Sequence, residues 1–400
     1  MNIYLLGNGF DLHHKFPTRY IDFLHTIQFL SENSEHEFSM VGDVFGNESL
    51  KNKNGFIKEC YDKHGSVYSS TPIQSEELES IISRANNNMW FKYLCNCVSK
   101  DIRWIDFEKE IIRVLQAFNS FFNDDGDFSL YDDRVTFDFS HFPSDAEDRH
   151  IISQFNFFIE KSEMWQARSV KMMCVKNEYI TEKVVGSDSY HLMEDDIVSE
   201  LYVSLRELAD ILRDYLKLFV DNPAKEMARL GIKPYFASMS MQSQVYSFNY
   251  TNTLEILYGN NSIDHIHGNT DNNIVLGVNP DENDEYGNVD TTFLQFKKYF
   301  QRVFFRTDIS FLTQMRFYER TPKINDRDLY VIGHSLDSTD EDVIRQIFES
   351  AKTITILYHN ETSIKDQIKN LVEIYGKEGL DVLREVKDLQ FVPQAEIRWE

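Results

Sequence analysis

The first hydrophobic segment of the chain is short and ends in a glycine-rich turn. Ile3-Tyr4-Leu5-Leu6 is an unbroken apolar run, and Gly7-Asn8-Gly9 follows it directly. Apolar side chains then recur at three- and four-residue intervals from Tyr20 to Leu30, with Thr18 as the expected N-cap. The pattern predicts a buried strand, a glycine turn and a helix. In α/β folds this order builds a phosphate cradle, because glycines let the backbone approach an anion.

The middle of the chain has a helical periodicity. Residues 31 to about 240 contain no second glycine-rich strand end, and their clearest element is an amphipathic stretch from about Asp195 to Phe219. Residues 123–145 are acidic and typical of a solvated loop. Asp106 and Glu108 leave two interpretations open, a cation-binding pair on an extended segment or a solvated pair beside packed aromatic residues.

Strand patterns return near residue 244. Ser338-Thr339-Asp340-Glu341 has the pattern of a capping box, at the start of a helix that separates the last two apolar runs. Alternating strands and helices predict an α/β fold, namely a Rossmann-like, doubly wound, mainly parallel sheet with its ligand site at the carboxyl ends of the strands. The strands expected after the first are residues 245–249, 263–268, 274–277, 329–333 and 354–358.

The expected core is therefore split in sequence. Residues 1–30 plus 241–400 would form the nucleotide-binding core, and residues 31–240 would form a large, mainly helical insertion. Hydrophobic residues make up 42% of the chain, with 31 Phe and 20 Tyr, so aromatic burial is plentiful.

Charge and composition exclude several classes. The chain has 41 Lys plus Arg against 65 Asp plus Glu, a net charge of -24, which disfavours nucleic acid as a partner. No apolar run approaches the ~20 residues that cross a bilayer, and no signal-peptide pattern is present, so a cytoplasmic protein without a membrane partner is expected. The four cysteines are irregularly spaced, so we expect no structural zinc and no other metal.

Each expected strand ends in residues suited to ligand contact. A single glycine or histidine at such a place is a weak signal, because most serve a turn or a local hydrogen bond. Their joint occurrence at one sheet edge favours a binding site. The candidates are Gly7, Asn8, Gly9, Phe10, Asp11, Asn249, Thr251, His267, Gly268, Gly277, Gly333, His334, Ser335 and Asn360.

Taken in order, these residues resemble the AbiH family of bacterial phage-exclusion proteins. The resemblance rests on Gly7-Asn8-Gly9-Phe10-Asp11-Leu12, the segment from Phe248 to Glu255, His267-Gly268-Asn269 and Gly333-His334-Ser335-Leu336. The same positions are similar to the sirtuin-like NAD-binding superfamily, whose G-A-G turn and catalytic His-Gly correspond to Gly7-Asn8-Gly9 and His267-Gly268. The similarity covers roughly residues 1–30 and 245–361.

The resemblance implies an antiphage effector that binds NAD and hydrolyses it to release nicotinamide. It implies that the pyrophosphate lies against the amides from Gly7 to Phe10 and that the adenosine half lies against Gly333, Ser335 and Asn360. His267 would be the general base, and Asn249 would position the ribose or the attacking water. A homo-oligomer, or a phage or host trigger protein, would restrain the activity.

Three departures from the sirtuin pattern leave other functions open. Nine residues separate His267 from Gly277, so the zinc module is missing and a protein deacylase is disfavoured. Thr251 stands where sirtuins carry an aspartate, and Asp11 brings a carboxylate beside the expected phosphates, which is repulsive unless it is compensated. A non-hydrolytic sensor of NAD or ADP-ribose is the main alternative, and a nuclease is the least favoured. Helix capping by Asp11 and a structural role for His267 also stay open.

Overall fold

The computed structural model describes residues 2–98, 105–123, 128–131, 134–137, 146–165, 168–180, 192–232, 243–259, 263–279, 291–320 and 327–394. The chain divides into two compact units. Unit 1 joins Met1–Ile82, Ala209–Val275 and Lys298–Glu400, and unit 2 joins Ser83–Leu208 and Leu276–Lys297. The domain boundaries expected near residues 30 and 240 stay a prediction.

Unit 1 contains a parallel sheet, which has six strands in the described part of the chain. The strand order is β10-β9-β8-β1-β6-β7, and each neighbouring pair is parallel. Counted along the chain, this is the order 3-2-1-4-5-6 of doubly wound dinucleotide-binding folds, with its reversal between β1 and β8. The expected mixed α/β class is confirmed. The strands are β1 (Ile3–Leu6), β6 (Gln244–Ser247), β7 (Ile263–His265), β8 (Asp328–Ile332), β9 (Thr353–Tyr358) and β10 (Leu389–Pro393).

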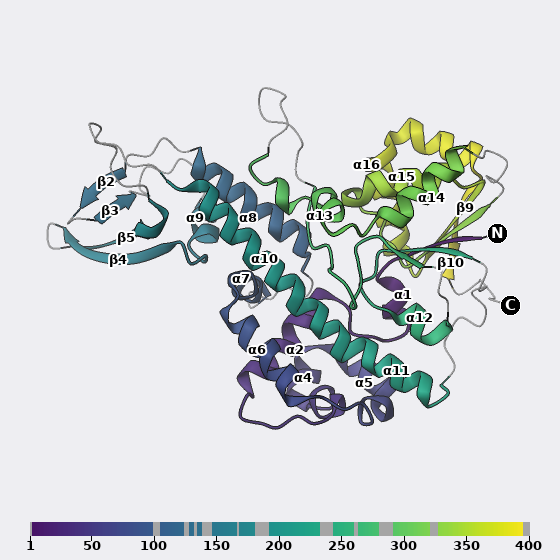
Figure 1. The fold of residues 1–400 in the computed structure, drawn as a ribbon, viewed down its shortest axis with the longest axis horizontal. Coiled ribbons are helices and arrows are strands. Elements are labelled where there is room, and N and C mark those ends of the chain that lie inside the picture. The colour runs from purple at the N-terminus through teal and green to yellow at the C-terminus, as the bar shows by residue number, and fades with distance from the viewer. Residues whose placement is uncertain are drawn as a thin grey trace. The chain divides into compact units, whose positions relative to one another are not determined.

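Helices cover both faces of this sheet, which explains why β1 is an unbroken apolar run. Ile3 and Leu5 pack in one core cluster with residues of α14 (Ile309–Arg320), α15 (Glu341–Glu349) and α16 (Glu361–Val386). Tyr4 and Leu6 point to the opposite face, where they pack with α1 (Gly9–His13) and α12 (Thr253–Tyr258). The two sets of helices lie on opposite sides of the strands (Figure 1).

The helix expected from Tyr20 is present, but its cap differs from the prediction. Arg19 is the N-cap of α2 (Tyr20–Glu32), and its amide donates to the Asp22 carboxylate at 3.1 Å. The Thr18 hydroxyl instead donates to Asn8 Oδ1 at 2.5 Å. The other helices of unit 1 are α3 (Val41–Phe45), α4 (Glu48–Lys53), α5 (Gly55–Tyr68), α11 (Asn222–Arg229) and α13 (Lys298–Phe305), with a π-helix at Lys217–Asp221.

Two further predictions near the sheet are wrong. Residues 274–277 are buried but form no strand, because Gly268 turns the chain back and the Val275 amide donates to His267 O rather than to a sheet neighbour. The expected capping box fails as well, because Asp337 caps a 3-10 helix at Ser338–Asp340 that precedes α15. Strand β10 was not expected at all.

Unit 2 is mostly helical and also holds two antiparallel hairpins that were not expected. Asp106 caps α8 by accepting hydrogen bonds from the amides of Glu108 and Lys109, so neither open interpretation of Asp106 describes its role. The long helix expected from about Asp195 is confirmed as α10. Trp104 and most of the predicted acidic loop, namely residues 124–127, 132–133 and 138–145, lie outside the described residues. The elements are α7 (Met89–Val98), α8 (Phe107–Phe122), β2 (Phe128–Tyr131), β3 (Arg134–Phe137), α9 (Ala146–Ile152), β4 (Phe158–Trp165) and β5 (Arg168–Val175), while α6 (Ser75–Asn87) and α10 (Glu194–Leu216) each contribute residues to both units.

Candidate functional site

Two glycine turns meet where the strand order reverses. Gly7-Asn8-Gly9 follows β1, and Gly333 follows β8, its neighbour in the sheet. A Cβ atom added to Gly9 would lie 2.6 Å from Gly333 Cα, and one added to Gly7 would lie 2.6 Å from His334 Cα. The two turns therefore pack backbone against backbone, which only glycine permits.

The amides of the first turn are already hydrogen-bonded within the chain. Gly7 N donates to Ile332 O at 3.0 Å, Gly9 N to Gly333 O at 2.8 Å and Phe10 N to Gly7 O at 2.9 Å. These contacts give the glycines a packing role. The predicted contact of these amides with a pyrophosphate stays a prediction.

His267 follows β7 and is paired with a buried carboxylate. Its Nε2 lies 3.0 Å from Asp340 Oδ1. The same oxygen accepts a hydrogen bond from Lys298 Nζ at 3.1 Å. The contact is a close charge pair, because Nε2 makes no hydrogen bond in this geometry. An ionised carboxylate beside Nε2 favours the tautomer that carries its proton on this nitrogen.

The electrostatics of this trio keep the imidazole neutral. Burial lowers the pKa of His267 against the opposing charge of Asp340. Burial alone would raise the pKa of Asp340, but Lys298 and His267 hold it well below its ordinary value. Burial also lowers the pKa of His334 to about 4, and the Nδ1 atom of His334 accepts a hydrogen bond from Leu336 N at 2.8 Å. The Phe248 ring contacts both imidazoles.

A second cluster contains the carboxylates of Asp11 and Asp221, whose hydrogen-bond partners include residues that follow strand β6. Thr251 Oγ1 donates to Asp11 Oδ2 at 2.6 Å, so the two residues that depart from the sirtuin pattern bind each other. Burial raises the pKa of Asp11 to about 6, although the hydrogen bond from Thr251 acts to lower it. Burial likewise raises the pKa of Asp221 to about 7, where Thr270 Oγ1 and the Asn252 amide donate to its carboxylate.

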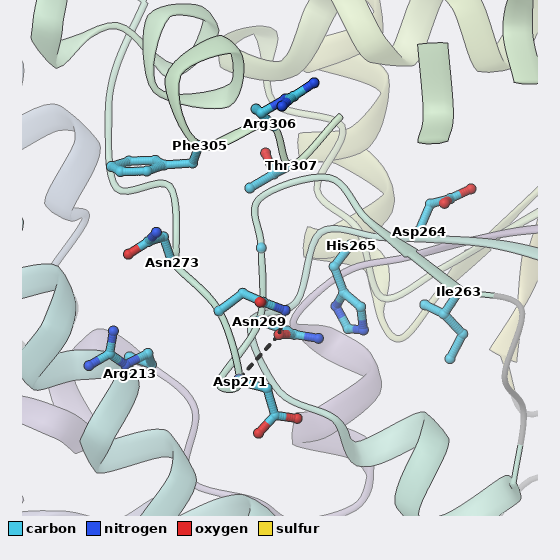
Figure 2. A pocket seen from close by; sticks show the side chains of 12 residues that line it. Arg213, Ile263, Asp264, His265, Asn269, Asp271, Asn273, Phe305, Arg306 and Thr307 are labelled. Carbon is cyan, nitrogen blue, oxygen red and sulfur yellow. Dashed lines mark hydrogen bonds between the residues drawn. The ribbon is translucent and has the colours of Figure 1, made fainter. Parts of the chain in front are cut away.

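His265 connects this cluster to a neighbouring cavity. Its Nε2 lies 2.6 Å from Glu255 Oε1, and its Nδ1 lies 3.1 Å from Asn249 O. Both partners are acceptors when Glu255 is ionised, so both ring nitrogens then carry a proton. Burial alone would lower the pKa of His265, but Glu255 raises it above its ordinary value. On its other side, His265 lines a cavity of about 620 Å³ in unit 1 (Figure 2).

Three buried oxygens of this region have no hydrogen-bond partner among the described residues. They are Asp11 Oδ1, Asn249 Oδ1 and Glu255 Oε2. Buried polar atoms are almost always paired, so these open acceptors, which follow β6 or lie on α1 and α12, indicate a ligand or water that brings donors. In the described ranges, no group of three His, Cys, Asp or Glu side chains is arranged to hold a metal ion.

The predicted site residues fall into distinct environments. Asp11, Asn249, Thr251, His267 and His334 are buried in unit 1 near the carboxyl ends of the strands. Asn8, Ser335 and Asn360 are exposed, and Asn360 also caps α16 by accepting a hydrogen bond from Ser363 N. Phe10 belongs to the core, Gly268 adopts a positive φ of 74° in a turn, and Gly277 falls in unit 2. Residues 281–285, an acidic segment after Gly277, lie outside the described residues.

Sequence reasoning missed several functional candidates. Lys298 gave no signal, because one lysine at a helix start resembles any other. Asp340 was interpreted as part of a helix cap, although its carboxylate holds His267. Glu255 ends the motif that begins at Phe248, but its pairing with His265 depends on strand register, which the sequence does not reveal.

Asp221→Asn is expected to flatten the pH dependence of stability. A raised carboxyl pKa stabilises the folded state fully below about pH 4, and this contribution is lost as pH rises through about 7. The variant lacks that titration, so its free energy of unfolding should fall less between pH 4 and pH 8, by about 4 kcal/mol, because one pKa unit corresponds to ~1.4 kcal/mol. Urea unfolding at both pH values measures this. Asp366→Asn, at an exposed position, is the matched control, and equal pH dependence in Asp221→Asn and the native chain would contradict the prediction.

Comparisons with known proteins give one family. The family described as "Bacteriophage abortive infection AbiH" matches residues 3–359. The searches of curated proteins and of solved structures give no match. Within the described ranges, no helix has the length and apolar character needed to cross a membrane. A match over residues 3–359, which is most of the chain, shows that this chain belongs to the AbiH family of bacteriophage abortive infection.

Proposed function

We propose that this chain acts in abortive infection by hydrolysing a nucleotide at the strand-end site, and that NAD is its substrate. The observation that carries the proposal is the His267–Asp340 pair, with 3.0 Å between Nε2 and Oδ1, at the carboxyl end of a doubly wound parallel sheet. Ligands of such sheets bind at that edge. A sirtuin-like relationship of the core is part of the proposal, and the motif order supports it.

The chemistry needs a base and acceptors for sugar hydroxyls. In the proposed reaction water attacks the anomeric carbon of the nicotinamide ribose, the bond to nicotinamide breaks, and His267 takes the water proton. The leaving nicotinamide becomes neutral as it takes the bonding electrons, so it needs no added proton. The unpaired oxygens of Asn249 and Asp11 are suited to accept ribose hydroxyls. Fixed acceptors also stabilise the oxocarbenium-like centre.

A second candidate is binding without hydrolysis. The bond from Thr251 to Asp11 favours it, because a hydroxyl engaged at 2.6 Å is not available to orient the nicotinamide amide. The amides of Gly7, Gly9 and Phe10 also favour binding without hydrolysis, because they already donate hydrogen bonds within the chain and are not free for a pyrophosphate. The chain would then be a sensor of NAD or ADP-ribose in phage defence.

Incubation of the purified chain with NAD tests both candidates. We expect free nicotinamide and ADP-ribose in equal amounts, measured by liquid chromatography. Calorimetric titration with NAD and with ADP-ribose runs in parallel. Binding without nicotinamide release would replace the hydrolase with the sensor, and neither binding nor release would contradict NAD as the ligand.

A further inference from the structure

Helix α13 is amphipathic in the reverse of the usual sense. A helix on the surface of a globular protein normally turns its apolar side inward. The residues that α13 buries are polar, and each is no more than 2% exposed: Lys298, Gln301 and Arg302. The residues that it exposes are large and apolar: Tyr299 at 62%, Val303 at 54% and Phe304 at 66%. The outward side of α13 is therefore unlike a side that is meant for water alone.

The buried contacts fix this orientation of the helix. Lys298 Nζ donates to Asp340 Oδ1 at 3.1 Å and to Thr339 Oγ1 at 2.9 Å. Arg302 donates to the Asp342 carboxylate. Separating one partner from a buried ion pair costs about 3–5 kcal/mol, so α13 cannot turn its aromatic side inward at low cost.

The exposed side chains form one apolar face of α13. Val303 follows Tyr299 by four residues, so the two lie on the same side of the helix. The Phe304 ring stacks on the half-buried Phe300 ring, with 6.1 Å between centroids and 10° between planes. An aromatic side chain has roughly 150–250 Å² of surface, so the three exposed residues leave on the order of 350 Å² to solvent. Apolar patches of about 300–600 Å² on a monomer are often functional.

The charges near this α13 face are unusual for so acidic a chain. Within residues 298–317, the exposed ionisable side chains are those of Arg306 and Arg316, and no carboxylate is exposed. Asp342, which reaches α13 from α15, is neutralised by Arg302. The net charge of the whole chain is -24, so its other surfaces repel a second copy, nucleic acid and anionic lipid alike. At the α13 face, two copies can meet without bringing carboxylates of α13 or α14 together.

We propose that the α13 face, made of Tyr299, Phe300, Val303 and Phe304, is the contact between two copies of this chain. Two such faces together remove on the order of 700 Å² of apolar surface from water. A stable interface of about 1,200 Å² in total, the lower end of the usual range, has about this apolar share. The contact is isologous, with α13 of one copy against α13 of the other, and the dimer is reversible. It does not depend on NAD hydrolysis, because association is measured without substrate.

Sedimentation equilibrium of the purified full chain, from low to high micromolar concentration, tests this contact. The fraction of dimer should rise with concentration. Phe304→Asp and Val303→Asp should each weaken association about tenfold or more, because each brings two carboxylates into the buried contact. Both side chains are exposed in the single chain, so urea unfolding of these variants should match the native chain.

A matched control separates the α13 face from a general effect of charge. Val382 lies on α16 and is 56% exposed, close to the 54% of Val303, so Val382→Asp adds the same charge elsewhere and should leave association unchanged. The proposal is overturned if the native chain stays monomeric, if Phe304→Asp associates as the native chain does, or if Val382→Asp weakens association equally. A monomeric chain that co-sediments with phosphatidylserine vesicles would assign the face to a membrane and would overturn the dimer as well.

Discussion

Replacing His267 by alanine is expected to lower NAD hydrolysis about 10²–10⁴-fold, the usual contribution of a general base. The imidazole is neutral at pH 7 because burial lowers its pKa, so its lone pair is available to take a proton from water. For the same reason, the rate of the native chain should fall on the acid side as His267 becomes protonated. Initial rates of nicotinamide release from pH 5 to pH 8 measure both effects.

A second variant tests whether Asp340 acts through His267, with urea unfolding as a check on the fold because Asp340 also pairs with the buried Lys298. Asp340→Asn keeps the size of the side chain but removes the charge that orients His267 through Nε2. We expect a smaller loss of rate than for His267→Ala, with a changed acid limb of the pH profile. His36→Ala, at an exposed histidine, is the control. A native rate in a folded His267→Ala variant would remove His267 from the mechanism.

Gly333→Ala is expected to cause the largest loss of stability. Its φ of 66° disfavours any side chain, and an added Cβ atom would lie 2.5 Å from Gly9 C and 2.7 Å from Gly9 Cα. Neither neighbour is the end of a flexible side chain, so the two turns would have to separate. Backbone strain and overpacking each cost about 1–3 kcal/mol, so we expect a loss of about 3 kcal/mol or more.

Thermal and urea unfolding measure this loss. Gly55→Ala is the matched control, because an added Cβ atom there meets nothing within 4 Å and the residue begins α5. Its free energy of unfolding should stay level or rise slightly. Equal stability of Gly333→Ala and Gly55→Ala would show that the close packing of the two turns is not needed for folding.

The apolar pattern predicted most of the sheet, since strands covered on both faces have continuous apolar runs. Strand β1 matched its expected residues, and β6, β8 and β9 matched within two residues. The same signal failed at residues 274–277, where Ile274, Val275 and Leu276 are fully buried without joining the sheet. An apolar run predicts only that its side chains are buried. Pairing in a sheet also requires a neighbouring strand whose backbone N–H and C=O groups are free to form hydrogen bonds.

By itself, the sequence determined the α/β class, the glycine turns and the order of motifs that marks the AbiH family. These features are local, since each depends on residue types within a few positions. Only the tertiary structure decided the partners: Asp340 and Lys298 for His267, Thr251 for Asp11, Glu255 for His265, and Gly333 for Gly9. These pairs join residues on different elements, and their meeting depends on strand order and register, which the whole core fixes at once.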